Sequence, residues 1–175
     1  MSNIVLDQPH SSINFQVKHM MVSKAKGEFR DFDIQVDGDI NDLENLSIEA
    51  VIQTASIDTN QADRDAHLKS EDFFDAEKYP TIKFVSKSMK KVSGDTYELT
   101  GDVTMKGVTN EETFTVNFNG QGKEPMQGNT IAGFDFSGTI NREAYGLSWN
   151  AALETGGVLV GKDVKVNGEI ELIIK

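Results

Sequence analysis

The chain has 175 residues, the length of one domain that can enclose its own core, and 38% of them are hydrophobic, a globular rather than a disordered proportion. Its formal charge of −11 comes from 17 basic and 28 acidic side chains, which argues against a nucleic acid as partner because phosphate backbones require clustered Lys and Arg. The absence of cysteine excludes disulfides, thiolate nucleophiles and Cys-based zinc sites. We therefore expect a single domain over residues 1–175.

The N-terminal segment 1–7 lacks the charged region and long apolar run of a secretory signal. No apolar run elsewhere reaches the length that spans a membrane. These features predict a cytoplasmic protein without stable membrane insertion.

Alternation of apolar and polar residues, which in a strand sends apolar side chains to one face, recurs in eight stretches. Three of them precede residue 53 and five follow residue 81. Their inward positions are, in order, Ile13/Phe15/Val17, Phe32/Ile34/Val36, Leu46/Ile48/Ala50/Ile52, Ile82/Phe84/Ser86, Tyr97/Leu99/Gly101/Val103, Phe114/Val116/Phe118, Ala132/Phe134/Phe136/Gly138/Ile140 and Val164/Val166/Gly168/Ile170/Leu172. The change of parity between Phe29 and Phe32 indicates a bulge or a short loop near Arg30 and Asp31.

The links between these stretches contain residues that tolerate positive φ, which predicts tight turns at Asp37-Gly38, Ser93-Gly94-Asp95 and Asn119-Gly120. Two links differ. Residues 60–74 have helical spacing with Asn60 as the expected N-cap, and the Gly-rich segment 141–162 holds the only tryptophan, Trp149, which is typical of a lid. The sequence predicts an all-β fold, an eight-stranded antiparallel up-and-down barrel with a short helical segment between the third and fourth strands. A two-sheet sandwich is the main alternative.

The interior of such a barrel is either filled by side chains or holds one slender ligand. Seven of the ten phenylalanines share the inward parity, while Ala50, Ser86, Gly101, Ala132 and Gly138 also point inward and fill little volume. Large walls with small gaps are compatible with a lumen. The pattern alone favours a packed core, because most apolar stripes are core.

Several segments resemble the YceI-like family: Asp7 to His19 (DQPHSSINFQVKH) its opening, Gly27-Glu28-Phe29 its next turn, and Ser56 to Thr59 with Arg64 to Phe84 its most distinctive block. Residues 101–109 and 141–147 extend the likeness. The resemblance implies a lipocalin-like barrel that holds an apolar-chain lipid such as a polyisoprenoid quinone, a polyprenyl phosphate or a similar amphiphile, for storage, shielding or transport. Two departures are the missing secretory signal and Lys106, where relatives often have histidine.

On this interpretation the lumen is expected to be lined by apolar side chains of the strands, the helical segment and the late loop. The residues are Phe15, Val17, Phe32, Ile52, Phe73, Phe74, Phe84, Leu99, Phe134, Phe136 and Trp149. Arg64, His67 and Arg142 are the hypothetical contacts of a polar head group. In the alternative, Arg64 and Asp65 fix the helix onto the barrel, Arg142 binds loop carbonyls, and His67 pairs with Asp63.

The chain carries little that predicts catalysis. Its three histidines, His10, His19 and His67, have no recognised metal-ligand spacing, so no metal is expected. There is no nucleophile elbow and no phosphate loop, so we expect neither an enzyme nor a cofactor. The competing hypotheses are an enzyme that uses His67 as acid or base on a barrel-bound lipid, and a ligand-free, stress-related interaction module. A homodimer is compatible with the sequence.

Overall fold

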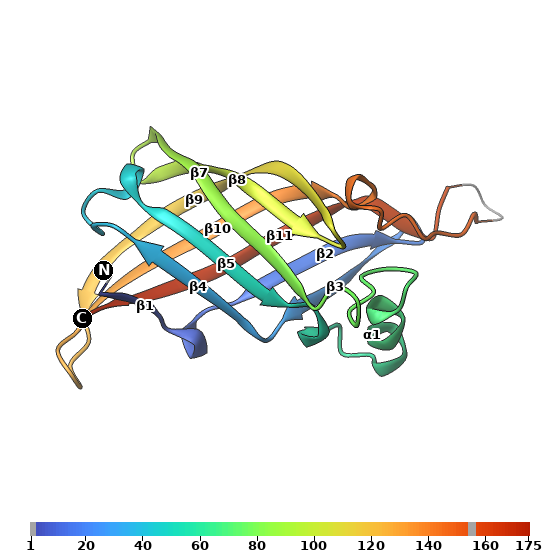
Figure 1. Ribbon diagram of the computed structural model, residues 1–175, viewed down its shortest axis with the longest axis horizontal. Helices are drawn as coiled ribbons and strands as arrows, with labels where there is room; N and C mark the ends of the chain where they lie inside the picture. Colours follow the sequence, from blue (N-terminus) through green and yellow to red (C-terminus); the bar gives the residue numbers. More distant parts are fainter. Residues whose placement is uncertain (1–2, 154–156) are drawn as a thin grey trace.

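The computed structural model describes residues 3–153 and 157–175, and in them a single antiparallel sheet of eleven strands dominates (Figure 1). The strands are β1 (Ile4–Leu6), β2 (Ile13–His19), β3 (Ser23–Phe29), β4 (Phe32–Asp37), β5 (Ser47–Gln53), β6 (Ile57–Asp58), β7 (Thr81–Ser93), β8 (Thr96–Met105), β9 (Val108–Lys123), β10 (Thr130–Asn141) and β11 (Val160–Ile174). One α-helix, α1 (Ala62–Lys69), and the 3-10 turns η1 (Gln8–His10), η2 (Leu43–Asn45), η3 (Thr54–Ser56) and η4 (Arg142–Tyr145) complete the described elements. Residues 1–2 and 154–156, the latter within the predicted late loop, lie outside the described part.

The sheet has the strand order β4-β5-β7-β8-β9-β10-β11-β2-β3-β6, and β1 pairs with β11. From β7 to β11 each strand pairs with the next in sequence, as expected for a meander. The sheet curls so that β1 lies against β4, while β6 pairs with β3 (Figure 1). One face of every long strand therefore points into a shared apolar interior.

The prediction of an all-β antiparallel fold with one short helix is confirmed, but eight strands was too few. β1 and β6 have 3 and 2 residues, too short for an alternation to register. β3 alternates, but its inward positions include Ala25 and Gly27, which carry little hydrophobic signal. Gly27-Glu28-Phe29, expected in a turn, lies in β3, and Asn119-Gly120 lies inside β9.

The change of parity at Arg30 and Asp31 is a two-residue corner between β3 and β4. Backbone hydrogen bonds hold it to the next part of the chain: Arg30 N–H donates to the Ser56 carbonyl at 3.2 Å, and Gln53 N–H donates to the Asp31 carbonyl at 2.9 Å. The corner is therefore a short link and not a bulge.

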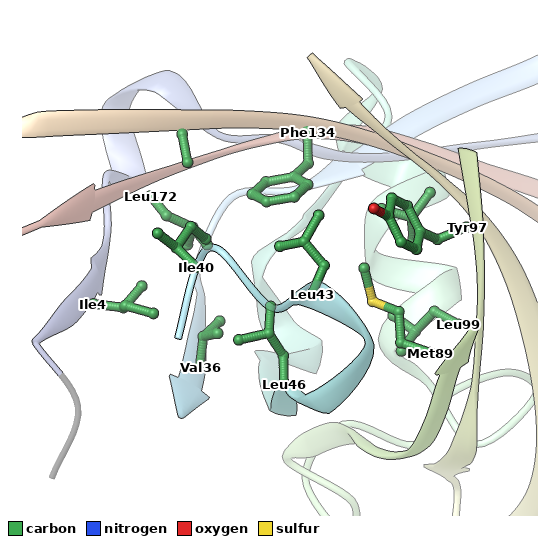
Figure 2. Close-up of a cluster of buried hydrophobic side chains, with 12 residues drawn as sticks. Ile4, Val36, Ile40, Leu43, Leu46, Met89, Tyr97, Leu99, Phe134 and Leu172 are labelled. Carbon is green, nitrogen blue, oxygen red and sulfur yellow. The ribbon is translucent and has the colours of Figure 1, made fainter. Parts of the chain in front are cut away.

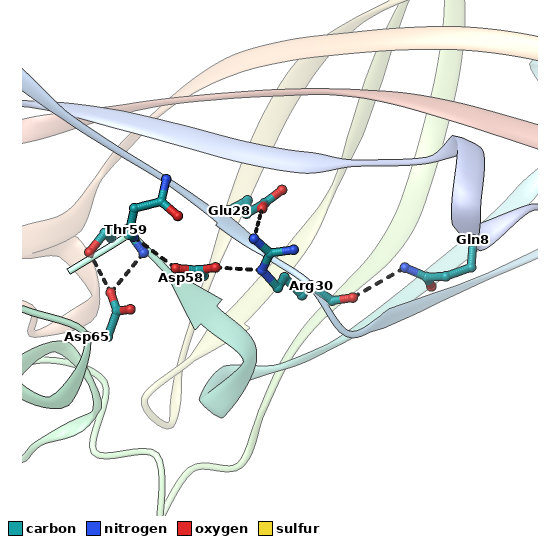
Figure 3. A network of polar contacts seen from close by, with 7 residues as sticks. Gln8, Glu28, Arg30, Asp58, Thr59 and Asp65 are labelled. Atoms are coloured by element: carbon teal, nitrogen blue, oxygen red, sulfur yellow. Dashed lines mark hydrogen bonds and ion pairs between the residues drawn. The ribbon is translucent and has the colours of Figure 1, made fainter. Parts of the chain in front are cut away.

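Helix α1 begins one residue later than predicted, since Gln61 rather than Asn60 is the N-cap and its side chain accepts the Arg64 N–H at 2.9 Å. Arg64 donates through Nε to the Thr59 hydroxyl and through Nη2 to the Thr59 carbonyl, both at 2.8 Å. Asp65 accepts the Thr59 N–H at 2.8 Å, and the neighbouring Asp58 binds Arg30 (Figure 3). Arg64 and Asp65 thus fix the helix to the end of β6.

Four glycines of the interior face provide seats for phenylalanine rings of neighbouring strands. The pairs, each with the ring within 2.7 Å of a Cβ built on the glycine, are Gly27 with Phe15, Gly101 with Phe84, Gly138 with Phe114 and Gly168 with Phe136. Gly101 and Gly138, the two glycines expected to leave empty volume, are thus covered by rings, and a side chain at any of the four positions would displace one.

We expect Gly168→Ala to lower the free energy of unfolding by about 1–3 kcal/mol, the usual cost of overpacking. A Cβ at Gly168 would lie 2.0 Å from the Ser12 carbonyl oxygen and 2.6 Å from the Phe136 ring, so backbone as well as side chain must shift. Gly122→Ala in β9 is the matched control, because its Cβ meets nothing within 4 Å. Urea denaturation measures the free energy of unfolding of both variants. Equal stability of the two would contradict the interpretation that the Phe136 ring needs a glycine at position 168.

The buried apolar residues form two clusters. The first closes the end of the sheet near the termini, where η2 and its flanks place Ile40, Leu43 and Leu46 against Met89 and Phe134 (Figure 2). The second lies beneath α1 and η4, and includes Phe29, Phe73, Tyr145 and Leu147. Both ends of the interior are therefore covered by irregular segments.

Candidate ligand-binding cavity

A cavity of about 280 Å³ remains inside the curled sheet, between the two buried clusters. Its walls come from strands β2 to β5 and β7 to β11, and from Leu68, Phe73 and Phe74 on and after α1. The lining is apolar apart from Lys83 and Arg142. This volume exceeds the roughly 150 Å³ of an engineered apolar cavity that admits benzene. The space suits an apolar group and offers almost no hydrogen-bond partner to a polar one.

The structure places nine of the eleven residues predicted to face the lumen on the cavity wall. They are Phe15, Val17, Ile52, Phe73, Phe74, Phe84, Leu99, Phe134 and Phe136. Phe32 is instead buried in the cluster beneath α1, and Trp149 packs outside the lining, against the same cluster.

Other wall residues were missing from the predicted set. Met89 faces the cavity because the register of β7 on β8 shifts between Ser86 and Ser88, which changes the parity after Ser86. Leu68 and Leu147 come from α1 and the late loop, where no alternation exists to follow. Ile34 and Val103 also line the cavity, and both stand at inward positions of strands that the alternation predicted.

Arg142 lines the cavity, yet its guanidinium is committed to the backbone. The residue is 5% exposed. Nε donates to the Gly161 carbonyl at 2.7 Å, Nη2 to Val160 at 3.2 Å, and Nη1 to Trp149 at 3.1 Å and to Leu147. Burial lowers the pKa of this guanidinium from its ordinary value. Arg142 therefore ties the late loop to the start of β11, which is the loop-carbonyl alternative.

His67 and Arg64 are half-buried on α1, and neither lines the cavity. His67 Nε2 lies 2.9 Å from an Asp72 carboxylate oxygen, so its partner is Asp72 and not Asp63. The His67 ring meets Trp149 edge-on, with centroids 4.7 Å apart, and Phe73 at 5.0 Å. Trp149 of the late loop thus packs on α1 and closes this end of the interior by ring contacts.

Tyr145 anchors the late loop at its base. Its side chain is fully buried and its hydroxyl donates to a Glu112 carboxylate oxygen on β9. Burial, reinforced by the hydrogen bond to Glu112, raises the pKa of the Tyr145 hydroxyl well above its ordinary value. Gly146 follows with φ +78, a conformation that glycine adopts without strain, and ends the 3-10 turn η4.

The three histidines do not converge. His10 lies with Asp7 and Glu171, and their ligand atoms, all within 4.8 Å of one another, form the one group of this kind in the described residues. His10 Nδ1 lies 2.8 Å from Asp7 and 3.2 Å from Glu171. The hydrogen bond to Asp7, with the negative charges of Asp7 and Glu171, raises the pKa of His10 above its ordinary value. Ion pairing accounts for these contacts.

This pairing predicts a small pH-dependent stability. Because the folded-state pKa of His10 lies above its unfolded value near 6.5, its contribution is fully present below about pH 6.5 and is lost as pH rises through the folded pKa. We expect His10→Gln to lower the melting temperature more at pH 5.5 than at pH 8.5. The same loss at both pH values would show that the contact is not electrostatic.

An antiparallel sheet curled around an apolar cavity defines a class of β proteins with an apolar interior space. Within that class the chain belongs to the YceI-like family, whose domain model matches residues 5–172. It is 51% identical over 174 residues to UPF0312 proteins of Staphylococcus aureus and of Staphylococcus epidermidis, covering 99% of this chain and 99% of each relative.

Solved structures share the fold. BcnA of Burkholderia cenocepacia superposes with a TM-score of 0.82 at 25% identity, covering 95% of this chain and 98% of its own. The Campylobacter jejuni YCEI protein gives 0.75 at 29% identity and 90% of each chain. A polyisoprenoid-binding domain from Saccharophagus degradans gives 0.74 at 13% identity over 100% of both chains, a likeness of fold alone.

Proposed function

We propose that the chain binds an apolar-chain lipid, an isoprenoid quinone, a polyprenyl phosphate or a similar amphiphile, in the cavity, for storage, shielding or transport. The observation that carries the proposal is the interior cavity of about 280 Å³ with apolar walls. The fold-level likeness to a polyisoprenoid-binding domain supports the same ligand class. The predicted lumen residues that line the cavity are the proposed contacts of the chain.

The walls favour long apolar chains over short ones. Each buried CH₂ group gains roughly 0.8 kcal/mol when it leaves water, while a polar group without a hydrogen-bond partner costs about 1–3 kcal/mol. A polar head group therefore stays at an end of the cavity. We assign the entrance to the α1 end, which is covered only by ring contacts of Trp149 with His67 and Phe73. The other end is closed by η2 and its flanks, which pack in the cluster of Figure 2.

Arg64, His67 and Arg142 remain the proposed neighbours of a head group at this entrance. Arg142 and Arg64 already donate to carbonyl and hydroxyl oxygens, so His67 has the most freedom to change partner: its Asp72 contact lies at the surface, where the two side chains are 38% and 54% exposed. His67→Ala is then expected to weaken binding of a lipid with an anionic head more than binding of a neutral isoprenoid.

The proposal is tested by purifying the protein without detergent, extracting it with organic solvent and identifying co-purified lipids by mass spectrometry. Added isoprenoid is expected to raise the melting temperature, because a ligand of the native state stabilises it by mass action. A chain that extracts empty and whose melting temperature does not respond to isoprenoids or fatty acids would contradict the proposal.

A further inference from the structure

An apolar surface projects from the end of the molecule that carries the late loop. It consists of Met20, Met21 and Val22 in the β2–β3 turn and Val158 just before β11, which are 46%, 50%, 86% and 38% exposed. We call these four residues the tip. Figure 1 shows the β2–β3 turn and the segment before β11 together at one end of the long axis, with both termini at the other end.

Backbone contacts join the two halves of the tip. Met20 N–H donates to the Leu159 carbonyl at 2.8 Å. A Cβ on Gly157 would lie 3.0 Å from Met21 Cγ, so the Met21 side chain rests on the segment before β11. The four apolar side chains therefore belong to one surface that the two segments support jointly.

The turn of the tip is built from residues that its backbone disfavours. Val22 N–H donates to the His19 carbonyl at 3.2 Å and closes a turn in which Met20 and Met21 have φ of +52 and +65. Asn and Gly are the usual residues in such a turn, because they adopt positive φ with little strain, whereas methionine does not. Two exposed methionines in strained positions indicate a requirement other than stability.

Lysines surround the tip in a chain whose formal charge is −11. Residues 18–26 hold Lys18, Lys24 and Lys26 and no acid. Lys18 and Lys24 are direct cross-strand partners, an arrangement of like charges that destabilises a hairpin. No ion pair within the described part of the chain involves these three lysines.

The neighbouring strand extends this basic surface. β11 adds Lys162 and Lys165 beside the single acid Asp163, and a Cβ on Gly161 would lie 3.2 Å from Lys18 Cβ, which places the start of β11 against β2. Exposed apolar side chains flanked by lysines are the combination that binds an anionic bilayer interface: the apolar groups enter the head-group boundary and each lysine contributes attraction.

We propose that the tip docks reversibly on the surface of an anionic lipid bilayer, with Met20, Met21 and Val22 among the outer acyl carbons and Lys18, Lys24 and Lys162 at the head groups. This inference rests on the proposed function, because Val17, Val160 and Val164, which adjoin the tip, line the cavity. Docking would bring the entrance to the membrane from which an apolar chain is taken or to which it is delivered. Residues 58–77, which include α1, hold seven acidic and two basic side chains. Figure 1 shows α1 to one side of this end, so the tip is the part that approaches.

The test is flotation with vesicles of phosphatidylcholine containing 30 mol% phosphatidylglycerol, compared with vesicles of phosphatidylcholine alone. The wild-type chain is expected to float with the anionic vesicles and to be released by 0.5 M NaCl, because surface charges are screened. Lys18→Glu with Lys24→Glu should lower the partition coefficient at least about tenfold, since one lysine near the surface is worth about fivefold. Met20→Asn with Met21→Gly, which suits the turn, should lower it about tenfold without lowering the melting temperature.

Matched controls lie at the opposite end of the sheet. Lys90→Glu with Lys91→Glu makes the same change of net charge on exposed β7 positions, and Met126→Ser removes an apolar side chain that is 90% exposed. Both controls should float like the wild type. Equal losses in the tip and control variants, or flotation with neither vesicle, would overturn the docking proposal.

The two proposals fail separately. Isoprenoid-induced stabilisation in solution, measured on the same variants, should be unchanged by the tip substitutions. Its absence in a wild-type chain that still floats would overturn the proposed function and leave docking standing. Sedimentation without vesicles tests whether the tip binds a second copy of this chain. If the wild type is a dimer, the variant Met20→Asn with Met21→Gly is a monomer and the wild type does not float, the tip is a dimer contact.

Discussion

Arg142→Ala is expected to lower the free energy of unfolding by about 3 kcal/mol or more, a larger loss than that expected for Gly168→Ala. Four carbonyl oxygens, those of Leu147, Trp149, Val160 and Gly161, accept hydrogen bonds from this one buried side chain. A hydrogen bond to a charged group contributes roughly 1.5–3 kcal/mol, and a buried acceptor that loses its donor pays its desolvation cost. The contributions of the four hydrogen bonds are not additive, but each of them stabilises the folded state.

Two variants separate this role from charge alone. Arg142→Lys keeps a cation but offers one nitrogen in place of three, and it should recover less than half of the loss because the planar fork is what reaches carbonyls on two segments. Arg30→Ala is the surface control: Arg30 binds Asp58 at 2.6 Å and Glu28 at 3.0 Å but is 62% exposed, so a much smaller loss of stability than that of Arg142→Ala is expected. Denaturation in urea measures all three, and an Arg142→Ala variant as stable as Arg30→Ala would contradict the anchoring role.

Trp149 supplies a local readout of the same substitution. It is the only tryptophan, and its ring contacts His67 and Phe73 while its carbonyl accepts from Arg142. Release of the late loop should therefore expose the indole and shift its fluorescence to longer wavelength below the unfolding transition. A loss of stability without this shift would place the effect of Arg142 elsewhere than in the loop.

The strands that the sequence predicted are those whose inward positions carry large apolar residues, as Phe134 and Phe136 do in β10. β3 went unrecognised because Ala25 and Gly27 face inward, and Gly27 is small for a reason visible only in three dimensions: the Phe15 ring occupies its Cβ position. The hairpin between β2 and β3 gave no turn signal, because Met20 and Met21 are not turn formers. Local rules fail there because both residues adopt the positive φ that turn rules assign to Asn or Gly.

The wall of the cavity was partly predictable for the same reason. Residues in long strands follow parity, so Phe15, Phe84 and Leu99 could be placed before the structure was known. Trp149 could not, because its position depends on the contact of the late loop with α1, which no periodicity records. The sequence is compatible with two roles for Arg142, and its carbonyl partners are visible only in three dimensions. Sequence pattern thus predicts faces of strands, whereas the ends of the cavity depend on contacts between irregular segments.

Filling the cavity is expected to abolish lipid binding while the fold persists. Ala50 on β5 is buried and lines the cavity, so the ring of Ala50→Phe would occupy the space proposed for the ligand chain. We expect at least about a tenfold loss in affinity, which corresponds to 1.4 kcal/mol and to fewer than two displaced CH₂ groups. The available volume of about 280 Å³ lets the added ring enter without forcing the strands apart.

The matched control adds the same ring to the other face of the sheet. Val85 on β7 is 49% exposed and pairs with Glu49, the residue before Ala50, so Val85→Phe tests the effect of a new phenylalanine without touching the cavity. Isoprenoid should raise the melting temperature of Val85→Phe as it does that of the wild type, and should leave that of Ala50→Phe unchanged. The ring of ligand-free Ala50→Phe enters an apolar space that solvent or ligand would otherwise occupy. Its free energy of unfolding should therefore fall by at most about 1–3 kcal/mol relative to the ligand-free wild type, the usual cost of overpacking. Equal ligand responses in both variants would place the binding site outside this cavity.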